Sequence, residues 1–420
     1  MEGRRLLDTL RNQHIETPAF IYDEGQLIED TQLALDAIRG ERTRLLFAMK
    51  AFTIPSGLEA IASVADGFHA SSLFEAKLGR EILGPGRVIH LTTPGIRPAD
   101  AGELFELCDL VSFNSLTQWV GFREEATGRT GCGLRVNPRL SNVADERYDP
   151  CRRHSKLGVS IEEMRETLHS DPDLLDGITG LMFHTNCDAL DTTPLLETVR
   201  YLDHHLGNLL RRLRWIDLGG GYLFFGNQAP LASEDGRPRR LFRCGRISGR
   251  RAADLDGLHQ ALDLLRSRYE LTIYLEPGAS ISRRAGSFVA SVIDTFQSAG
   301  RTVAVLDTTV NHMPEVLEFD CHPDAVGDLE RGGYRCVLAG ATCLAGDIFG
   351  EYAFANPPEV GSRVVFPNMG AYSMVKANFF NGVNLPSIYA LGKDGTLRLE
   401  HMFSYNDFLQ HCGGLHHVRA

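Results

Sequence analysis

The stretch Leu45-Leu46-Phe47-Ala48-Met49-Lys50 says most about the fold of this chain. An unbroken apolar run of this length is typical of a strand that is buried on both faces of a parallel sheet. A lysine at its end is unusual, because an ammonium group is costly to bury without a partner. Lysine also forms Schiff bases with carbonyl compounds once its pKa is lowered. Lys50 is therefore either a salt-bridged cation at a strand end or an amine with a chemical role.

Seven further apolar, β-rich runs follow this stretch and alternate with helical patterns. Strands that alternate with helices indicate a parallel sheet, and eight of them in about 230 residues fit a (β/α)8 barrel. A doubly wound open sheet fits the spacing almost as well, although no G-x-G-x-x-G follows the first strand. The further strands are predicted at Gly67–Ser71, Arg87–Leu91, Asp109–Phe113, Cys132–Asn137, Ile178–His184, Arg214–Leu218 and Thr272–Glu276, and helices at Leu73–Leu83, Ile161–His169, Thr193–Leu213 and Leu255–Arg268.

The pattern changes after Pro277, where β-rich runs are separated by turns and few helical stretches. This change predicts a mostly antiparallel β domain after the barrel. We place the barrel at 38–277 and assign 1–37 and 278–420 to the β domain, because Thr17–Tyr22 is also strand-like. Residues 226–251 are polar, Gly-rich and basic, and we expect them to form a long insertion after the seventh strand. The β domain's other predicted strands are Phe288–Phe296, Thr302–Leu306, Tyr334–Leu338, Arg363–Phe366 and Leu397–His401.

Composition narrows the class of protein. The 420 residues are 43% apolar and 23% charged, as in an ordinary globular protein, and the formal net charge is −11. The acidic balance argues against nucleic-acid or anionic-membrane partners and favours cationic ligands. No run reaches the length of a membrane span, and the N-terminus lacks the apolar core of a signal peptide. The nine cysteines show neither a paired pattern nor zinc-site spacing, so we expect reduced thiols, a cytoplasmic location and no metal.

In a (β/α)8 barrel the reactive groups lie at the carboxyl ends of the strands. Lys50, His184 and Glu276 end the first, sixth and eighth predicted strands, and Gly219-Gly220-Gly221 follows the seventh. Consecutive glycines let backbone N–H groups approach an anion, and phosphate sites recur after strand 7 of such barrels. A carboxylate that faces a pyridine nitrogen keeps it protonated, and an imidazole can stack on the ring. Together these groups describe a site for pyridoxal 5'-phosphate (PLP).

Each group also has an ordinary structural explanation when it is considered alone. The glycine triplet can form a tight turn, the histidine can be a hydrogen-bonded core residue, and the carboxylate can cap a turn or pair with an arginine. In the second domain, Cys343 precedes Asp347 in a glycine-flanked stretch that we expect to be a loop; a buried thiol and an N-cap are the alternatives. Tyr372 is either a packed aromatic residue or a donor to a phosphate.

Several blocks of the sequence resemble the fold-type III PLP-dependent decarboxylases, and the carboxynorspermidine (carboxyspermidine) decarboxylase branch is the most similar. The resemblance covers nearly the whole chain. It implies an alanine racemase-like (β/α)8 barrel followed by a β domain, and a head-to-tail homodimer with shared active sites. The matching blocks include TPAFIYD, LLFAMKAF, HASSLFEAKLG, NPRLS, RHSKLGV, FHTNCD, WIDLGGG, YLEPGAS, LDTTVNHMPEVLEF, GATCLAGDIFGEY and YSMVKANFFNGVNLPSI.

The resemblance also implies a role for each candidate residue. Lys50 carries the cofactor, and Cys343 returns a proton to the substrate after CO2 leaves. The loop that carries Cys343 and Asp347 reaches the cofactor of the partner subunit, and Asp347 holds the distal amine of a cationic amino-acid substrate. Apart from the resemblance, the acidic residues Glu315, Glu318 and Glu351 are further candidate counter-charges for that amine. The cofactor-binding set comprises Lys50, His184 beside the ring, Glu276 at the pyridine nitrogen, and Gly219, Gly220, Gly221 and Tyr372 at the phosphate.

The sequence departs from the family at positions near the expected substrate. Ala279 follows the E-P-G where ornithine-type enzymes have arginine, Asp188 stands where this branch has glutamate, and Ala371 precedes Tyr372 where histidine is usual. We therefore expect PLP-dependent decarboxylation of a carboxylated polyamine such as carboxynorspermidine or carboxyspermidine. The alternatives are another aminocarboxypropyl or basic amino-acid substrate in a natural-product pathway, a racemase of the same fold, and a non-catalytic regulatory relative.

Overall fold

The computed structural model describes residues 6, 10, 15–141, 143, 146–224, 254–318, 322–327 and 333–414. The described residues form two compact units. We call the one within 28–226 and 251–281 the barrel unit, and the one within 1–27 and 282–420 the sheet unit. The predicted insertion at 226–251 lies outside the described residues. The domain limits drawn at 38 and 277 stay predictions.

The barrel unit is built on a closed ring of parallel strands, as the alternating pattern predicts. Each strand pairs with the next, and the last pairs with the first, so that no strand of the ring has an open edge. This closure excludes the doubly wound open sheet. The ring consists of β2 (Thr43–Ala48), β3 (Gly67–Ala70), β4 (Val88–Thr92), β5 (Leu110–Phe113), β6 (Gly131–Asn137), β8 (Gly180–Met182), β9 (Trp215–Asp217) and β10 (Thr272–Leu275), and the short β7 (Val159–Ser160) pairs with β6.

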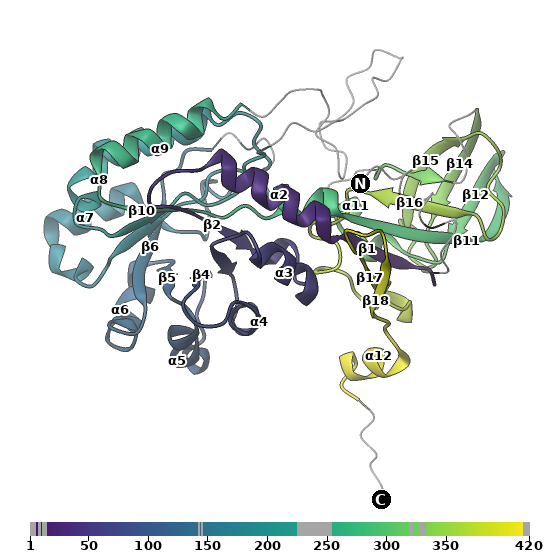
Figure 1. The fold of residues 1–420 in the computed structure, drawn as a ribbon, viewed down its shortest axis with the longest axis horizontal. Helices are drawn as coiled ribbons and strands as arrows, with labels where there is room; N and C mark the ends of the chain where they lie inside the picture. Colours follow the sequence, from purple (N-terminus) through teal and green to yellow (C-terminus); the bar gives the residue numbers. More distant parts are fainter. Residues whose placement is uncertain are drawn as a thin grey trace, which may run out of the picture. The chain divides into compact units, whose positions relative to one another are not determined.

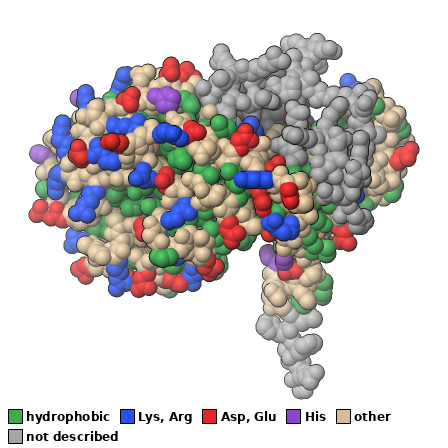
Figure 2. Space-filling view, viewed as in Figure 1, with side chains coloured by type: hydrophobic (Ala, Val, Ile, Leu, Met, Phe, Trp, Pro, Cys, Tyr) green, Lys and Arg blue, Asp and Glu red, His purple; other side chains and the backbone are tan. Residues whose placement is uncertain are grey.

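Helices connect these strands and surround the ring (Figure 1). Ser72, Ser115 and Ser160 cap three of them by accepting a hydrogen bond from a backbone N–H of the first turn. On the face drawn in Figure 2, acidic and basic side chains are interspersed over the barrel unit. Among the described helices, none is both long and apolar enough for a membrane span. The helices are α3 (Pro55–Ala62), α4 (Leu73–Leu83), α5 (Pro98–Leu107), α6 (Leu116–Ala126), α7 (Ile161–Ser170), α8 (Thr193–Leu210) and α9 (Asp256–Arg268).

The sheet unit is mostly antiparallel, as expected. The N-terminal strand β1 lies between β11 and β17, which explains why Thr17–Tyr22 belongs with the C-terminal part of the chain. Only the β1–β17 and β12–β14 pairs are parallel among the described strands of this unit. Its strands are β1 (Ala19–Asp23), β11 (Gly286–Ser298), β12 (Arg301–Leu306), β13 (Val326–Gly327), β14 (Tyr334–Ala339), β15 (Ile348–Phe354), β16 (Arg363–Pro367), β17 (Ser387–Leu391) and β18 (Leu397–His401), and its short helices include α11 (Glu315–Glu318) and α12 (Tyr405–His411).

Three strands of the sheet unit were not predicted, β13, β15 and β17. The first has only two residues, Gly350 interrupts the second with a positive φ, and the third is a five-residue run directly after Pro386. Each therefore lacks either the length or the regular pattern by which an isolated strand is recognised. The remaining elements, α2 (Glu24–Ala37) and α10 (Ala279–Ser282), join residues of the two units along the chain.

The interior of the barrel is layered. Because side chains alternate along a strand, residues two positions apart point to the same side. One buried cluster consists of Leu46, Leu110, Met182, Trp215 and Tyr274. The residues that follow two positions later on these strands and on β4 are mostly polar. This second layer includes His90, Ser112, His184, Asp217 and Glu276.

Trp215 fills the apolar layer only because two facing strands carry glycine. A Cβ atom added at Gly180 would lie 2.0 Å from the indole ring, and one at Gly133 would lie 2.4 Å from it. The indole N–H lies 3.2 Å from the hydroxyl oxygen of Thr179, to which it donates. The apolar floor of the barrel therefore depends on these small residues.

We predict that Gly180→Ala destabilises the protein by about 1–3 kcal/mol, because the indole must move or the strand must shift to admit a methyl group. Urea unfolding of the two proteins measures this difference. Gly95→Ala is the matched control, since a Cβ atom there meets nothing within 4 Å. An unfolding free energy for Gly180→Ala equal to that of the control would contradict the packing argument.

Candidate active site

Lys50 lies in a 3-10 turn, η1 (Met49–Ala51), which directly follows β2. The residue keeps accessible surface although the surrounding protein desolvates its amine. Desolvation lowers the pKa of Lys50, the charge of Glu276 opposes this shift, and the charge of Arg135 adds to it. Lys50 forms no hydrogen bond or ion pair with any described residue. The geometry thus favours an amine with a chemical role over a salt-bridged lysine.

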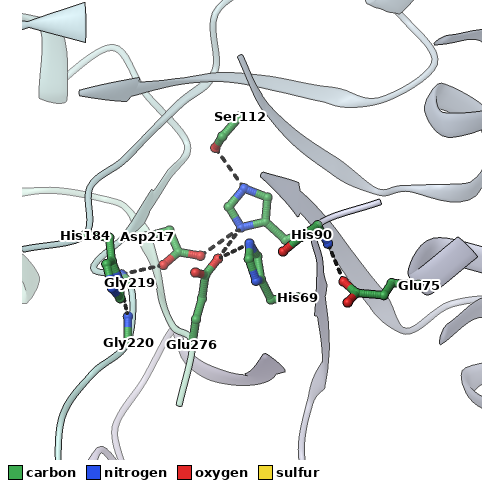
Figure 3. Close-up of polar contacts among 10 residues, drawn as sticks. His69, Glu75, His90, Ser112, His184, Asp217, Gly219, Gly220 and Glu276 are labelled. Carbon is green, nitrogen blue, oxygen red and sulfur yellow. Dashed lines mark hydrogen bonds and ion pairs between the residues drawn. The ribbon is translucent and has the colours of Figure 1, made fainter. Parts of the chain in front are cut away.

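A buried set of polar side chains surrounds Glu276, which directly follows β10 (Figure 3). Nδ1 of His90 lies 2.8 Å from Oδ2 of Asp217 and 3.2 Å from Oε1 of Glu276. Nε2 of His90 lies 2.8 Å from the hydroxyl oxygen of Ser112. Nε2 of His69 lies 3.2 Å from the same Oε1 atom of Glu276. Four barrel strands and the residue after a fifth therefore meet around one carboxylate.

This set holds a cation between two carboxyl groups. Desolvation lowers the pKa of His90, but Asp217 and Glu276 outweigh it and raise the pKa to about 9. Desolvation and the charge of Asp217 raise the pKa of Glu276, and the hydrogen bond and charge of His90 oppose this rise. Desolvation and the charge of His90 lower the pKa of His69 well below its usual value. His90 is therefore the charged imidazole of the set, and His69 is neutral.

Several buried polar atoms near the carboxyl ends of the strands have no hydrogen-bond partner among the described residues. Such atoms are rare in native proteins, and a ligand or an ordered water molecule commonly supplies the missing partner. Their position at the reactive end of the barrel fits a polar group such as PLP, the expected cofactor. These atoms are Nδ1 and Nε2 of His69, Oγ1 of Thr92, Oγ1 of Thr185, Nδ2 of Asn186, Oε1 of Glu276 and Oγ of Ser280.

The glycine triplet lies two residues beyond β9, where sequence places a phosphate site. The N–H of Gly219 donates to Oδ1 of Asp217 at 2.7 Å, and that of Gly220 donates to Nδ1 of His184 at 3.0 Å. Only the N–H of Gly221 donates to no described residue. A Cβ atom on any of the three would meet backbone atoms within 2.6 Å, so the loop requires glycine. The triplet therefore offers an anion one free donor rather than three.

His184 lies just beyond β8, which ends two residues earlier, and not within the strand as predicted. Because its Nδ1 atom accepts the hydrogen bond from Gly220, the neutral ring carries its proton on Nε2. Desolvation, together with the charges of Lys50 and Arg135, lowers the pKa of His184 well below its usual value. A neutral imidazole held in a fixed orientation is suited to stack on a flat ring.

Cys343 and Asp347 lie in one loop of the sheet unit, as expected. Cys343 is exposed, and its backbone N–H donates to Oδ1 of Asn381 at 2.9 Å. Asp347 is buried, and its carboxylate accepts hydrogen bonds from the N–H of Val310 at 2.8 Å and from the N–H of Thr342 at 3.0 Å. The hydroxyl group of Thr342 donates to it at 2.5 Å. These contacts engage the carboxylate within the chain, and its contact with a substrate stays a prediction.

The other candidate residues of the sheet unit also have charged partners within the chain. Glu315 is buried and lies 3.7 Å from the guanidinium of Arg283. Glu351 pairs with Arg301 on the surface, and Glu318 lies 2.5 Å from the ammonium of Lys376. That ammonium also lies 5.4 Å from the ring centre of Tyr372, which adopts a positive φ of 58°. Their predicted contacts with substrate and phosphate stay predictions.

The sequence reasoning assigned no role to His69, His90, Arg135 and Asp217. Arg135 is buried on β6 and forms no hydrogen bond or ion pair with a described residue, and its charge acts on Lys50 and His184. The available signal was a polar residue at an inward position of an otherwise apolar strand, as in VIHLT and GLRVN. To use that signal, one must know where each strand begins and ends and which of its side chains point into the barrel. The apolar runs alone give neither.

His90, Asp217 and Glu276 are also the one described group of potential metal ligands, with ligand atoms within 4.8 Å of one another. The 2.8 Å contact between His90 and Asp217 is an ordinary hydrogen bond. Direct hydrogen bonding accounts for the arrangement, and the Glu276 carboxyl group fits a cofactor with a basic ring nitrogen.

Comparison with known proteins places the chain in a family. The family described as "Pyridoxal-dependent decarboxylase, C-terminal sheet domain" matches residues 19–370. The carboxynorspermidine/carboxyspermidine decarboxylase of Herminiimonas arsenicoxydans is 32% identical over 402 residues, which cover 94% of this chain and 99% of that protein. The carboxyaminopropylagmatine decarboxylase of a Synechocystis species is 30% identical over 413 residues, with 97% and 98% covered.

A solved structure agrees with these relatives. The crystal structure of carboxynorspermidine decarboxylase from Campylobacter jejuni, complexed with norspermidine, is similar with a TM-score of 0.78 and 26% sequence identity. The similarity covers 94% of this chain and all of that chain, 100%. It supports both the barrel and the sheet domain of the predicted fold.

The charge of His90 predicts a pH-dependent stability. A raised pKa in the folded state means that its contribution is complete below pH 6.5 and is lost as the pH rises through about 9. We predict that the difference in unfolding free energy between the cofactor-free wild type and His90→Asn shrinks across this range. The expected decrease is on the order of 3 kcal/mol. Urea unfolding at several pH values measures it.

The lowered pKa of Lys50 has the opposite effect on the pH dependence of stability. It is present in wild type and in His90→Asn, so it cancels in the difference between them. His169→Asn, at an exposed position of α7, is the matched control for the loss of one histidine. A difference for His90→Asn that grows with rising pH would show that the imidazole is not held as a cation.

Proposed function

Since the chain belongs to the pyridoxal-dependent decarboxylases, it is a decarboxylase that uses PLP, and we propose that its substrate is a carboxylated polyamine. Carboxynorspermidine and carboxyspermidine are the first candidates. The observation that supports this choice is the near-complete coverage of the Herminiimonas arsenicoxydans and Campylobacter jejuni proteins, which are named for these substrates. The acidic net charge of −11 suits a polycationic substrate.

A second candidate substrate is carboxyaminopropylagmatine, because a relative of similar coverage is named for it. The compound shares its aminocarboxypropyl group with the first candidates and differs at the far end. The reacting centre is therefore the same, and the distinction depends on groups that bind the distal cation. We propose Asp347, Glu315 and Glu351 as the acidic residues to examine for this distinction.

PLP supplies an electron sink that accepts the pair of electrons left at the substrate Cα atom when CO2 departs. Lys50 is the proposed attachment point, since its lowered pKa makes the neutral, nucleophilic amine available. Glu276 Oε1 is buried and without a hydrogen-bond partner among the described residues, so it can hold the proton of the ring nitrogen. His184 and the free N–H of Gly221 would bind the ring face and the phosphate, with Tyr372 as a further phosphate ligand.

Cys343 is the proposed proton donor to Cα after CO2 leaves. Its exposed thiol is free in the described chain, and two anchors hold its loop: Asn381 binds the backbone N–H of Cys343, and Asp347 binds Thr342. A fixed backbone limits the positions that the thiol can take, which favours proton delivery to one atom.

We predict that CO2 release is fastest with carboxynorspermidine or carboxyspermidine. The panel should include carboxyaminopropylagmatine, ornithine, lysine, arginine and diaminopimelate, and kcat/KM is the quantity to compare.

Lys50→Ala should lose at least about a thousandfold in turnover, because the amine that binds the cofactor is absent. Full turnover by Lys50→Ala would refute the assignment of Lys50, and preference for diaminopimelate or ornithine would refute the substrate class.

We also propose a cytoplasmic homodimer in which each active site takes Cys343 from the partner. Free thiols suit a reducing compartment, and six described cysteines are free: Cys108, Cys132, Cys151, Cys336, Cys343 and Cys412. Exposed apolar residues of the sheet unit support an interface there. They are Leu344, Ile348, Phe380, Leu399, Met402 and Tyr405.

Shared sites predict complementation between two inactive variants. Lys50→Ala and Cys343→Ala should each have little activity alone, and subunit exchange in an equal mixture should restore about one quarter of the wild-type activity. This value follows because half of the dimers are mixed and each contains one intact site. Sedimentation measures the dimer. A dimeric mixture that has exchanged subunits and stays inactive would place both residues in one chain's own site.

A further inference from the structure

A layer of polar residues lies beneath Glu276 in the barrel, and none of its members has been assigned a role above. Ser112 on β5, His90 on β4 and Asp217 on β9 form a continuous line of contacts that ends at Glu276 (Figure 3). The side chains of His90 and Asp217 have no accessible surface, and that of Glu276 is 3% exposed. Water therefore does not solvate these charges, and their partners within the chain decide their state.

The contacts specify where protons lie. Nδ1 of His90 faces two carboxylate oxygens, so this nitrogen carries a proton and donates to Asp217. Nε2 faces the hydroxyl group of Ser112, which can accept a hydrogen bond from a second ring proton. With both protons, the imidazolium compensates one of the two buried carboxylates and attracts the other across 3.2 Å.

Asp217 connects this layer to the glycine loop. Its Oδ2 atom accepts from His90, and its Oδ1 atom accepts from the N–H of Gly219. Both oxygens are thereby oriented, and the carboxylate also lies beside Glu276, whose pKa it raises. The sequence analysis assigned no role to Asp217, the aspartate of the WIDLGGG block. In the structure it links His90 to the glycine loop.

We propose that His90, held between Asp217 and Ser112, is a positioning residue that keeps the Glu276 carboxylate ionised and oriented for the ring nitrogen of the cofactor. This inference rests on the role of Glu276 proposed above. His90 acts through Glu276 and is not itself a catalytic residue. A neutral side chain at position 90 leaves Glu276 beside Asp217 without a compensating cation, and the balance shifts toward protonated Glu276.

The charges that face this layer come from several elements of the barrel. Lys50 and Arg135 act on Glu276, and His69 on β3 faces both His90 and Glu276. The phenols of Tyr222 and Tyr274 face the carboxylates. His90 is distinguished from these groups because it alone lies at hydrogen-bonding distance from Asp217 and within 3.2 Å of Glu276.

The first test uses the cofactor-free protein and is independent of catalysis. Histidine-selective 15N labelling reports whether each imidazole is neutral or charged, and the signal that His90→Asn loses identifies His90. We expect a doubly protonated ring at pH 7 that titrates near pH 9. A neutral ring at pH 7 overturns the proposal, whatever substrate the enzyme uses.

The second test uses the holoenzyme and follows the absorbance of bound PLP with pH. In His90→Asn the ring nitrogen should lose its proton at a pH lower than in wild type by about one unit or more, because neutral Glu276 stabilises the pyridinium less. We expect kcat to fall by about 10–100-fold. KM should change by less than about threefold, because His90 does not contact the substrate. Asp217→Asn should shift the absorbance profile in the same direction, and the double variant should be non-additive.

His169→Asn is the control and should match wild type in absorbance profile and kcat. A folded His90→Asn protein with the wild-type absorbance profile overturns the proposal. If His90→Asn does not fold, Ser112→Ala decides the question, since it removes only the Nε2 partner and should give a smaller shift in the same direction. A wild-type profile for Ser112→Ala then overturns the proposal. Failure of the substrate panel alone affects the proposed function and leaves these readouts intact.

Discussion

The closed ring of parallel strands determines which side chains can meet in the barrel unit. All eight strands point the same way, so their carboxyl ends form one rim, and alternation along each strand selects every second residue for the interior. Apolar residues such as Leu46 and Trp215 fill the lower layer, and His90, Asp217 and Glu276 follow two positions later. Without closure, the residues of β4 and β9 would not face each other across the interior.

Burying the charged groups of the polar layer costs free energy, and the charge state of each group depends on its neighbours. Burying two carboxylates near each other is unfavourable unless a cation lies between them, and His90 provides that cation. Loss of one partner from such a buried set typically costs about 3–5 kcal/mol, because the other charge is left uncompensated. The arrangement is therefore better explained by the state in which it holds Glu276 than by a net gain in stability.

In the sheet unit, hydrogen bonds hold the backbone of the loop that carries Cys343. Its cysteine loop carries an exposed thiol, yet the loop backbone is anchored by Asn381 and by the buried carboxylate of Asp347. Asn381 itself has a positive φ of 55°, a conformation that asparagine tolerates better than most residues. An exposed reactive group on a fixed backbone is suited to deliver a proton to one atom.

The sequence by itself determined the eight barrel strands, the β domain with its N-terminal strand, and the positions of Lys50, Glu276 and the glycine triplet, because apolar runs and turn residues are local signals. It also carried the family resemblance. Only the tertiary structure decided that His90, Asp217 and Ser112 surround Glu276, that Gly221 alone of the triplet has a free N–H, and that Asp347 binds its own loop. These facts depend on contacts between residues far apart in the sequence, such as His90 and Asp217, which are separated by 127 positions. A local pattern cannot specify such contacts, because they exist only once the ring has closed.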